Sequence, residues 1–151
     1  MSIIIKNFIE SKFSNKANQY LLTIQKVGKI FAKVHSIDMP LGDIKPENAL
    51  IDSKGDIFLL DFEQSAYGGD KLWDLAVFFY FIGHYIPLSC DKTIIASIVN
   101  SFLVGYLSGS GNFNHVHNVG NTKYSRIFSV FILSSVLLEI ANVCKKAKIT
   151  N

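Results

Sequence analysis

The segment Leu41–Asn48, with the sequence Leu-Gly-Asp-Ile-Lys-Pro-Glu-Asn, constrains the fold of this chain most, because it leads directly into a sharp reversal of the chain. Two short apolar runs, Ala49–Ile51 and Ile57–Leu60, flank the turn Asp52–Asp56, which contains a glycine. Apolar runs of this length around a glycine-containing turn predict a β-hairpin. The residues just before and just after the hairpin must then lie side by side.

The hairpin brings together polar side chains that are apart in the sequence. Asn48 precedes its first strand, Asp61 comes after its second strand, and Asp43 lies just upstream. Amide and carboxylate oxygens are hard ligands of the kind that Mg²⁺ prefers. Asp43 is placed to orient a hydroxyl group and accept its proton, and Lys45 to contact a phosphate. We take these four side chains as the candidate site.

Composition predicts one folded domain. The 151 residues are 49% hydrophobic and 18% charged, which argues against disorder. A net charge of +3 with dispersed lysines is too weak to predict nucleic-acid binding. Cys90 and Cys144 form no metal-ligand pattern, so we expect buried reduced thiols. The apolar runs are shorter than the roughly 18–20 residues of a membrane span, so we predict core helices, no stable membrane insertion and a cytoplasmic protein.

Periodicity predicts a mainly helical chain. Apolar side chains recur at four- and three-residue steps from Tyr20 to Val34, which predicts a helix over residues 18–36. Further helices are expected at 73–86, 93–107 and about 124–148. The stretch Ser108–Asn121 is rich in Gly, Asn and Ser and is expected to be a loop. Ile3–Ile5 is β-branched and short, so we expect a strand there.

The sequence Gly-Asp-Ile-Lys-Pro-Glu-Asn at Gly42–Asn48 resembles the catalytic loop of the protein-kinase-like superfamily. That superfamily includes protein kinases, aminoglycoside phosphotransferases and choline kinases. Asp61-Phe62 is similar to its metal-binding motif, and residues 68–76 look like the start of its central buried helix. The resemblance implies an α+β fold, mainly α with a small β-hairpin, corresponding to the large C-terminal lobe. Residues 41–63 would hold the loop, hairpin and metal motif, and residues 70–151 a helical subdomain.

The resemblance also implies roles for individual residues. Asp43 would be the catalytic base and Lys45 the phosphate contact, while Asn48 and Asp61 would hold Mg²⁺, with Mn²⁺ as an alternative ion. Asp74 would brace the catalytic loop through backbone N–H groups. The implied reaction is transfer of the γ-phosphate of ATP to a hydroxyl group.

Departures from the family pattern bear on the acceptor. Leu41 stands where histidine is usual, and Glu63 replaces a glycine, as in choline kinases. The stretch between Asp61 and Asp74 is too short for a regulatory activation loop. Lys45, in contrast, favours a serine/threonine protein kinase. We predict that activity, with a small-molecule kinase of the aminoglycoside or choline type as the alternative.

The resemblance covers little of a small N-terminal lobe, which we expect to be largely missing. It implies the last small-lobe strand over Ile3–Phe8 and the hinge beside adenine at Asn7–Ser11. The nucleotide would then contact Phe8, Ile9, Glu10 and Leu50. Without the rest of that lobe we expect weak ATP binding. A partner chain completing the lobe, a degraded remnant, and a catalytically silent interaction module remain open explanations.

Histidines outside the motif are expected to be structural. His35 lies at the end of the first long helix, where we expect it to pack or cap that helix rather than catalyse. His115 and His117 are spaced for a metal, but no third ligand is near in the sequence, so we expect a polar loop.

Overall fold

The computed structural model describes residues 1–11, 16–87 and 90–148. These residues form seven α-helices and a two-stranded antiparallel hairpin, which confirms a mainly helical chain with a small β-hairpin. The helices are α1 (Ser2–Glu10), α2 (Ala17–Ser36), α3 (Lys71–Gly83), α4 (Lys92–Ser108), α5 (Phe113–Asn118), α6 (Thr122–Phe128) and α7 (Ser134–Lys146). The hairpin is β1 (Ala49–Ile51) and β2 (Ile57–Leu59), and the 3-10 turn η1 (Pro46–Asn48) leads into it.

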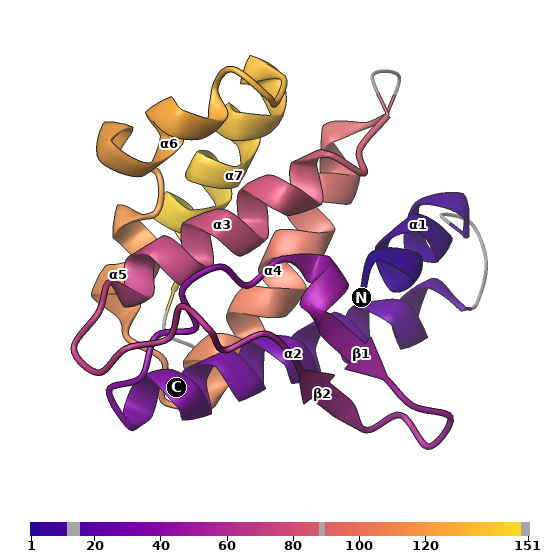
Figure 1. Ribbon diagram of the computed structural model, residues 1–151. Coiled ribbons are helices and arrows are strands. Elements are labelled where there is room, and N and C mark those ends of the chain that lie inside the picture. Colours follow the sequence, from indigo (N-terminus) through magenta and orange to yellow (C-terminus); the bar gives the residue numbers. More distant parts are fainter. Residues whose placement is uncertain (12–15, 88–89, 149–151) are drawn as a thin grey trace.

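Helices α2, α3 and α4 form the centre of the molecule (Figure 1). The hairpin and α1 lie at one end of this centre, and α5, α6 and α7 lie at the other. No helix among the described residues is both long and apolar enough to cross a membrane. The apolar run over residues 75–87 lies mostly in the buried helix α3, which confirms a core helix there. The run over residues 127–138 does not form one core helix, because it spans the end of α6, residues 129–133 and the start of α7, and Val130 and Phe131 are exposed.

The contact between α2 and α4 depends on two glycines. A Cβ atom on Gly28 would collide with the carbonyl oxygen of Phe102, and one on Gly105 with that of Gln25. The two backbones therefore approach too closely for any side chain at either position. Of the described element pairs, α2 and α4 pack most extensively.

Helix α3 is buried on nearly all sides, as its apolar sequence predicts. Phe78 packs against Phe31 of α2 and Phe102 of α4, with ring centroids 5.0 and 4.9 Å away. Asp70 begins the helix, since its side chain accepts hydrogen bonds from the backbone N–H groups of Leu72 and Trp73. This buried helix is the rigid support on which the candidate site rests.

The expected strand at Ile3–Phe8 and hinge at Asn7–Ser11 are wrong, because Ser2–Glu10 is helical. Helical geometry turns Ile5 and Phe8 to one face, where both are buried in the core. The α-amino group of Met1 donates a hydrogen bond to the carbonyl oxygen of Ala49, 2.5 Å away. Packing on the core and on β1 thus outweighs the strand propensity of three isoleucines.

Two boundaries near the C-terminal end also differ from expectation. Part of the expected loop at Ser108–Asn121 is helix α5, where Asn112 caps the first turn and Val116 is buried. The single helix expected over residues 124–148 is instead α6 and α7, with residues 129–133 outside both. Neither glycine nor proline marks that break.

Candidate active site

Asp74, in the first turn of α3, is the centre of the candidate site. Its carboxylate is fully buried and accepts hydrogen bonds from the backbone N–H groups of Leu41 and Gly42, at 2.6 and 2.8 Å. These are contacts of the kind that the resemblance implies for Asp74. Gly42 has a φ of +88°, and a Cβ there would collide with the backbone of Gln64, so only glycine fits.

His35 and Tyr106 complete the surroundings of this carboxylate. Nε2 of His35 lies 2.9 Å from Oδ2 of Asp74, and its Nδ1 lies 2.9 Å from the Tyr106 hydroxyl. A carboxylate only accepts hydrogen bonds, so we assign a proton to Nε2 of His35. In the tautomer with its proton on Nε2, Nδ1 accepts a hydrogen bond from the Tyr106 hydroxyl. One chain of hydrogen bonds therefore joins α4, α2, α3 and the loop.

The sequence predicted that His35 packs or caps its helix, and its burial shows that it packs, but the contact with Asp74 was not predicted. The position of His35 in the sequence was the signal that could have indicated a buried partner. His35 falls on the apolar face of α2 one turn after Phe31, where an unpaired polar side chain would be costly. A buried partner could have been expected on those grounds.

Asp43 and Lys45 lie on the loop that Asp74 holds. Nζ of Lys45 lies 2.8 Å from Oδ2 of Asp43, and both side chains are about one-third exposed, at 38% and 33%. The hydrogen bond from Lys45 to Asp43 is the main reason that the pKa of Lys45 is raised. The Lys45 ammonium also lies 5.2 Å from the centre of the Phe81 ring. The Lys45 side chain is therefore positively charged, and its ammonium group contacts Asp43, the candidate base.

Asn48 and Asp61 meet where the hairpin begins and ends. Nδ2 of Asn48 lies 3.3 Å from Oδ2 of Asp61 and 3.5 Å from the backbone oxygen of Asp43. The backbone N–H of Leu60 also donates to the carbonyl oxygen of Asn48, at 2.8 Å, so the hairpin ladder fixes the spacing of the two residues.

Asp61 has a φ of +65°, in the left-handed region that non-glycine residues rarely enter. Such conformations carry a cost in free energy and concentrate at functional sites. The conformation is tolerated here because aspartate and asparagine enter that region more readily than other residues. Its carboxylate lies at the surface, next to Asn48.

The oxygen donors here fit Mg²⁺ brought by a phosphate ligand. Asp61 offers an exposed carboxylate, and Asn48 offers an amide oxygen once its side-chain amide turns, because Nδ2 faces Asp61 in this structure. Both oxygens are hard ligands. Among the described residues there is no group of three His, Cys, Asp or Glu side chains that could hold a metal. Proteins commonly bind Mg²⁺ through one or two side chains plus substrate phosphates, so a cage of three is not required. His115 and His117, on α5, form no metal site among these residues.

The residues expected to contact the nucleotide lie on two elements, α1 and β1, and differ in exposure. Phe8 is buried in the core, Ile9 is half-buried, and Glu10 is exposed in the last turn of α1. Leu50 is exposed on β1, opposite Phe58. With the hinge absent from Asn7–Ser11, Leu50 is the member of this set that lies on the hairpin between Asn48 and Asp61.

No family model, no curated protein and no solved structure matches this chain.

Proposed function

We propose that this chain is the large lobe of a protein-kinase-like phosphotransferase, which transfers the γ-phosphate of ATP to a hydroxyl group. One observation carries the proposal. The buried Asp74 carboxylate holds the backbone of Leu41 and Gly42, and the loop so held presents Asp43, Lys45 and Asn48 beside Asp61.

Phosphoryl transfer needs positioning and charge stabilisation more than covalent help from the protein. In the proposed reaction the acceptor oxygen forms a bond to the γ-phosphorus while the bond to the bridging oxygen of ADP breaks. Asp43 orients the acceptor hydroxyl and takes its proton. Lys45 supplies positive charge close to Asp43, where negative charge on the transferred group develops.

Asn48 and Asp61 would hold Mg²⁺, which when bound neutralises charge on the nucleotide phosphates. Their side chains lie together at the surface, so both are accessible to a phosphate ligand. The Asn48 amide is neutral and the Asp61 carboxylate is charged. A change at Asp61 should therefore affect metal binding more.

For the acceptor, we propose a serine or threonine hydroxyl of a protein. The presence of Lys45, paired with the candidate base, supports this class. The short stretch between Asp61 and Asp74 supports the alternative, a small-molecule kinase of the aminoglycoside or choline type. An assay that offers both kinds of acceptor distinguishes the two classes by which acceptor receives the phosphate.

The second candidate function is a catalytically silent interaction module. It is favoured by the helical state of Ser2–Glu10, since the described residues then contain no small-lobe strand to cover a nucleotide. A partner chain could complete the lobe. Helix α1 offers it little apolar surface, because Ile5 and Phe8 point into the core, although Ile3 is exposed. The exposed apolar side chains of the hairpin, Leu50 and Phe58, are the better candidates for such a contact.

The test is transfer of labelled γ-phosphate from ATP with Mg²⁺ to two acceptor sets, one of serine- and threonine-containing peptides and one of aminoglycosides and choline. Asp43→Asn should abolish transfer and leave the circular dichroism spectrum unchanged. Asp56→Asn, in the exposed hairpin turn, is the matched control and should transfer phosphate as the wild type does. Transfer that persists in Asp43→Asn would overturn the assignment, whereas an inactive wild-type chain would favour the second candidate.

A further inference from the structure

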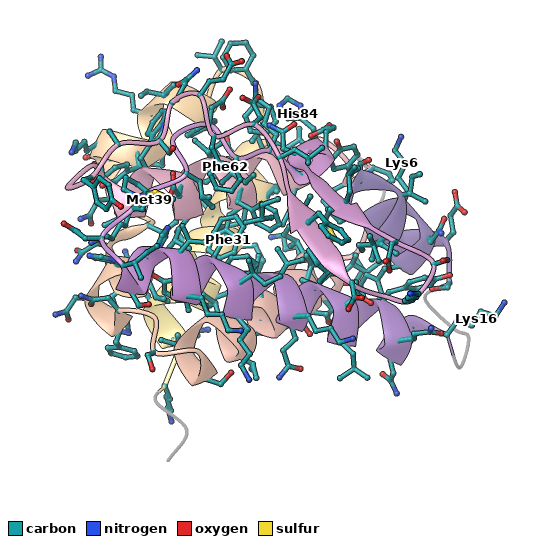
Figure 2. All side chains as sticks on the ribbon, turned by 60° about the horizontal axis from the view of Figure 1, so that its bottom comes forward. Lys6, Lys16, Phe31, Met39, Phe62 and His84 are labelled. Carbon is teal, nitrogen blue, oxygen red and sulfur yellow. The ribbon has the colours of Figure 1, made fainter. Side chains whose placement is uncertain are left out.

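A groove runs between α2 and β2, and none of the four candidate site residues Asp43, Lys45, Asn48 and Asp61 lines it. Its volume is about 540 Å³. We call it the α2–β2 groove. Its lining residues are Lys26, Lys29, Ile30, Lys33, Gly55, Asp56, Ile57 and Phe58. Figure 2, which brings α2 and the hairpin forward, shows the hairpin next to this helix, with its strands at an angle to the helix axis.

Three lysines give the groove its charge. Lys26, Lys29 and Lys33 follow one another along the exposed face of α2, and none of them forms an ion pair with a described residue. Of the described residues that line the groove, only Asp56 is acidic. Like charges this close on one helix face repel each other, so the groove is complementary to an anionic ligand.

The opposite wall is an unpaired strand edge. Antiparallel strands alternate between residue pairs that exchange two hydrogen bonds and pairs that exchange none. The bonds from Asp52 N–H to Asp56 and from Leu60 N–H to Asn48 fix this alternation. Ile57 and Leu59 consequently turn their backbone N–H and C=O groups away from β1, and no described residue outside the hairpin bonds to them.

We propose that the α2–β2 groove binds an extended acidic segment of a protein partner, which adds to β2 as a third strand. The backbone of Ile57 and Leu59 would supply the strand hydrogen bonds, and the three lysines would pair with acidic side chains. Lysines on an edge strand itself repel incoming strands. The three groove lysines lie on the facing helix α2 instead, where they favour an incoming strand with negative charge. Phe58, which is 53% exposed, adds apolar surface for one side chain.

The proposal is independent of phosphoryl transfer, so the two can fail separately. The probe is a fluorescent peptide of alternating Glu and Val, titrated with the full chain and followed by anisotropy. A Lys-Val peptide of equal length controls for charge. A Glu-Val peptide N-methylated at alternate amides controls for strand addition, because it keeps its charge but lacks the necessary donors. Isotope-labelled protein reports whether the amide signals of Ile57 and Leu59 shift.

The protein variant is the charge reversal Lys26→Glu, Lys29→Glu and Lys33→Glu. Its matched control is Lys92→Glu, Lys145→Glu and Lys146→Glu, which changes net charge equally at exposed sites outside the groove. The groove variant should weaken Glu-Val binding about tenfold or more, and the control variant should leave it nearly unchanged. Folding of both is checked by circular dichroism.

Binding of the Glu-Val peptide that is lost on N-methylation and in the groove variant would support the proposal. Equal weakening by both variants would overturn it, since binding would then depend on net charge alone. Unchanged binding of the N-methylated peptide would also overturn it, as would full displacement by a short single-stranded DNA with no shift at Ile57 and Leu59. In that last case the lysines would form a surface for anionic polymers.

Discussion

Nε2 of His35 and Oδ2 of Asp74 lie 2.9 Å apart inside the core, and the same carboxylate holds the backbone of the loop that carries Asp43. One buried side chain therefore links the packing of the core to the position of the candidate site. A buried carboxylate with several donors is costly to disrupt, because each donor that loses its partner stays out of contact with water.

Asp74→Asn should lower the free energy of unfolding by about 3 kcal/mol, because the amide replaces a charged acceptor and directs a donor at groups that also donate. Urea unfolding followed by circular dichroism measures this. Asp56→Asn, in the exposed hairpin turn, should change stability by less than about 0.5 kcal/mol. Equal effects in the two variants would contradict the bracing role of Asp74.

Tyr106→Phe should cost about 1 kcal/mol, since it removes the hydroxyl that bonds Nδ1 of His35 and leaves the packing of the ring in place. Tyr67→Phe is the matched control, because Tyr67 is 79% exposed. Both are measured by the urea midpoint at constant pH. A Tyr106→Phe protein as stable as the wild type would mean that His35 does not need this partner.

Stability should fall in alkali. Burial raises the pKa of the Cys144 thiol to about 12, that of Tyr106 to about 12, and that of Tyr80 further above its usual value. Each group is protonated and neutral in the folded protein but ionises at lower pH when unfolded. The stabilisation is complete below the unfolded pKa values and is lost as pH rises toward the folded ones.

The decline should begin above about pH 9 for Cys144 and about pH 10 for the tyrosines, with a slope of about 1.4 kcal/mol per pH unit for each ionising group. Urea midpoints between pH 8 and 11 measure it. Tyr106→Phe should make the decline less steep. A stability that is flat to pH 11 would show that these groups are not protected from ionisation.

Gly105→Ala should destabilise the chain by about 1–3 kcal/mol, although alanine favours a helix by about 1 kcal/mol. The reason is the collision of the new Cβ with the carbonyl oxygen of Gln25. Val104→Ala, at the half-exposed neighbouring position, is the control and should have little effect. Thermal unfolding measures whether Gly105→Ala raises or lowers stability. A stabilised Gly105→Ala protein would mean that α2 and α4 are farther apart.

The sequence predicted α2 and the hairpin well because their signals are local. A one-sided apolar period from Tyr20 to Val34 needs no knowledge of partners, and the turn at Asp52–Asp56 sets the hairpin by itself. The close approach of Asn48 and Asp61 results from that hairpin. The geometry of the candidate site was accessible for this reason.

Other features could not be predicted because they depend on contacts distant in sequence. Ile3–Ile5 has strand propensity, but helix α1 forms because Ile5 and Phe8 pack on the core. The bonds from His35 to Asp74 and Tyr106 join residues far apart in the chain, so the position of His35 on an apolar helix face indicates a buried partner but not which residue it is. The break between α6 and α7 has no glycine or proline to mark it.

Binding of ATP with Mg²⁺ by isothermal calorimetry tests the central claim most directly, with Asp61→Asn as the comparison. Asparagine also tolerates the left-handed backbone at this position, so the variant removes the charge without straining the turn. We predict weak, Mg²⁺-dependent binding at millimolar nucleotide that disappears in Asp61→Asn. No binding by the wild type at that concentration, or equal binding by the variant, would contradict a metal–phosphate site at Asn48 and Asp61.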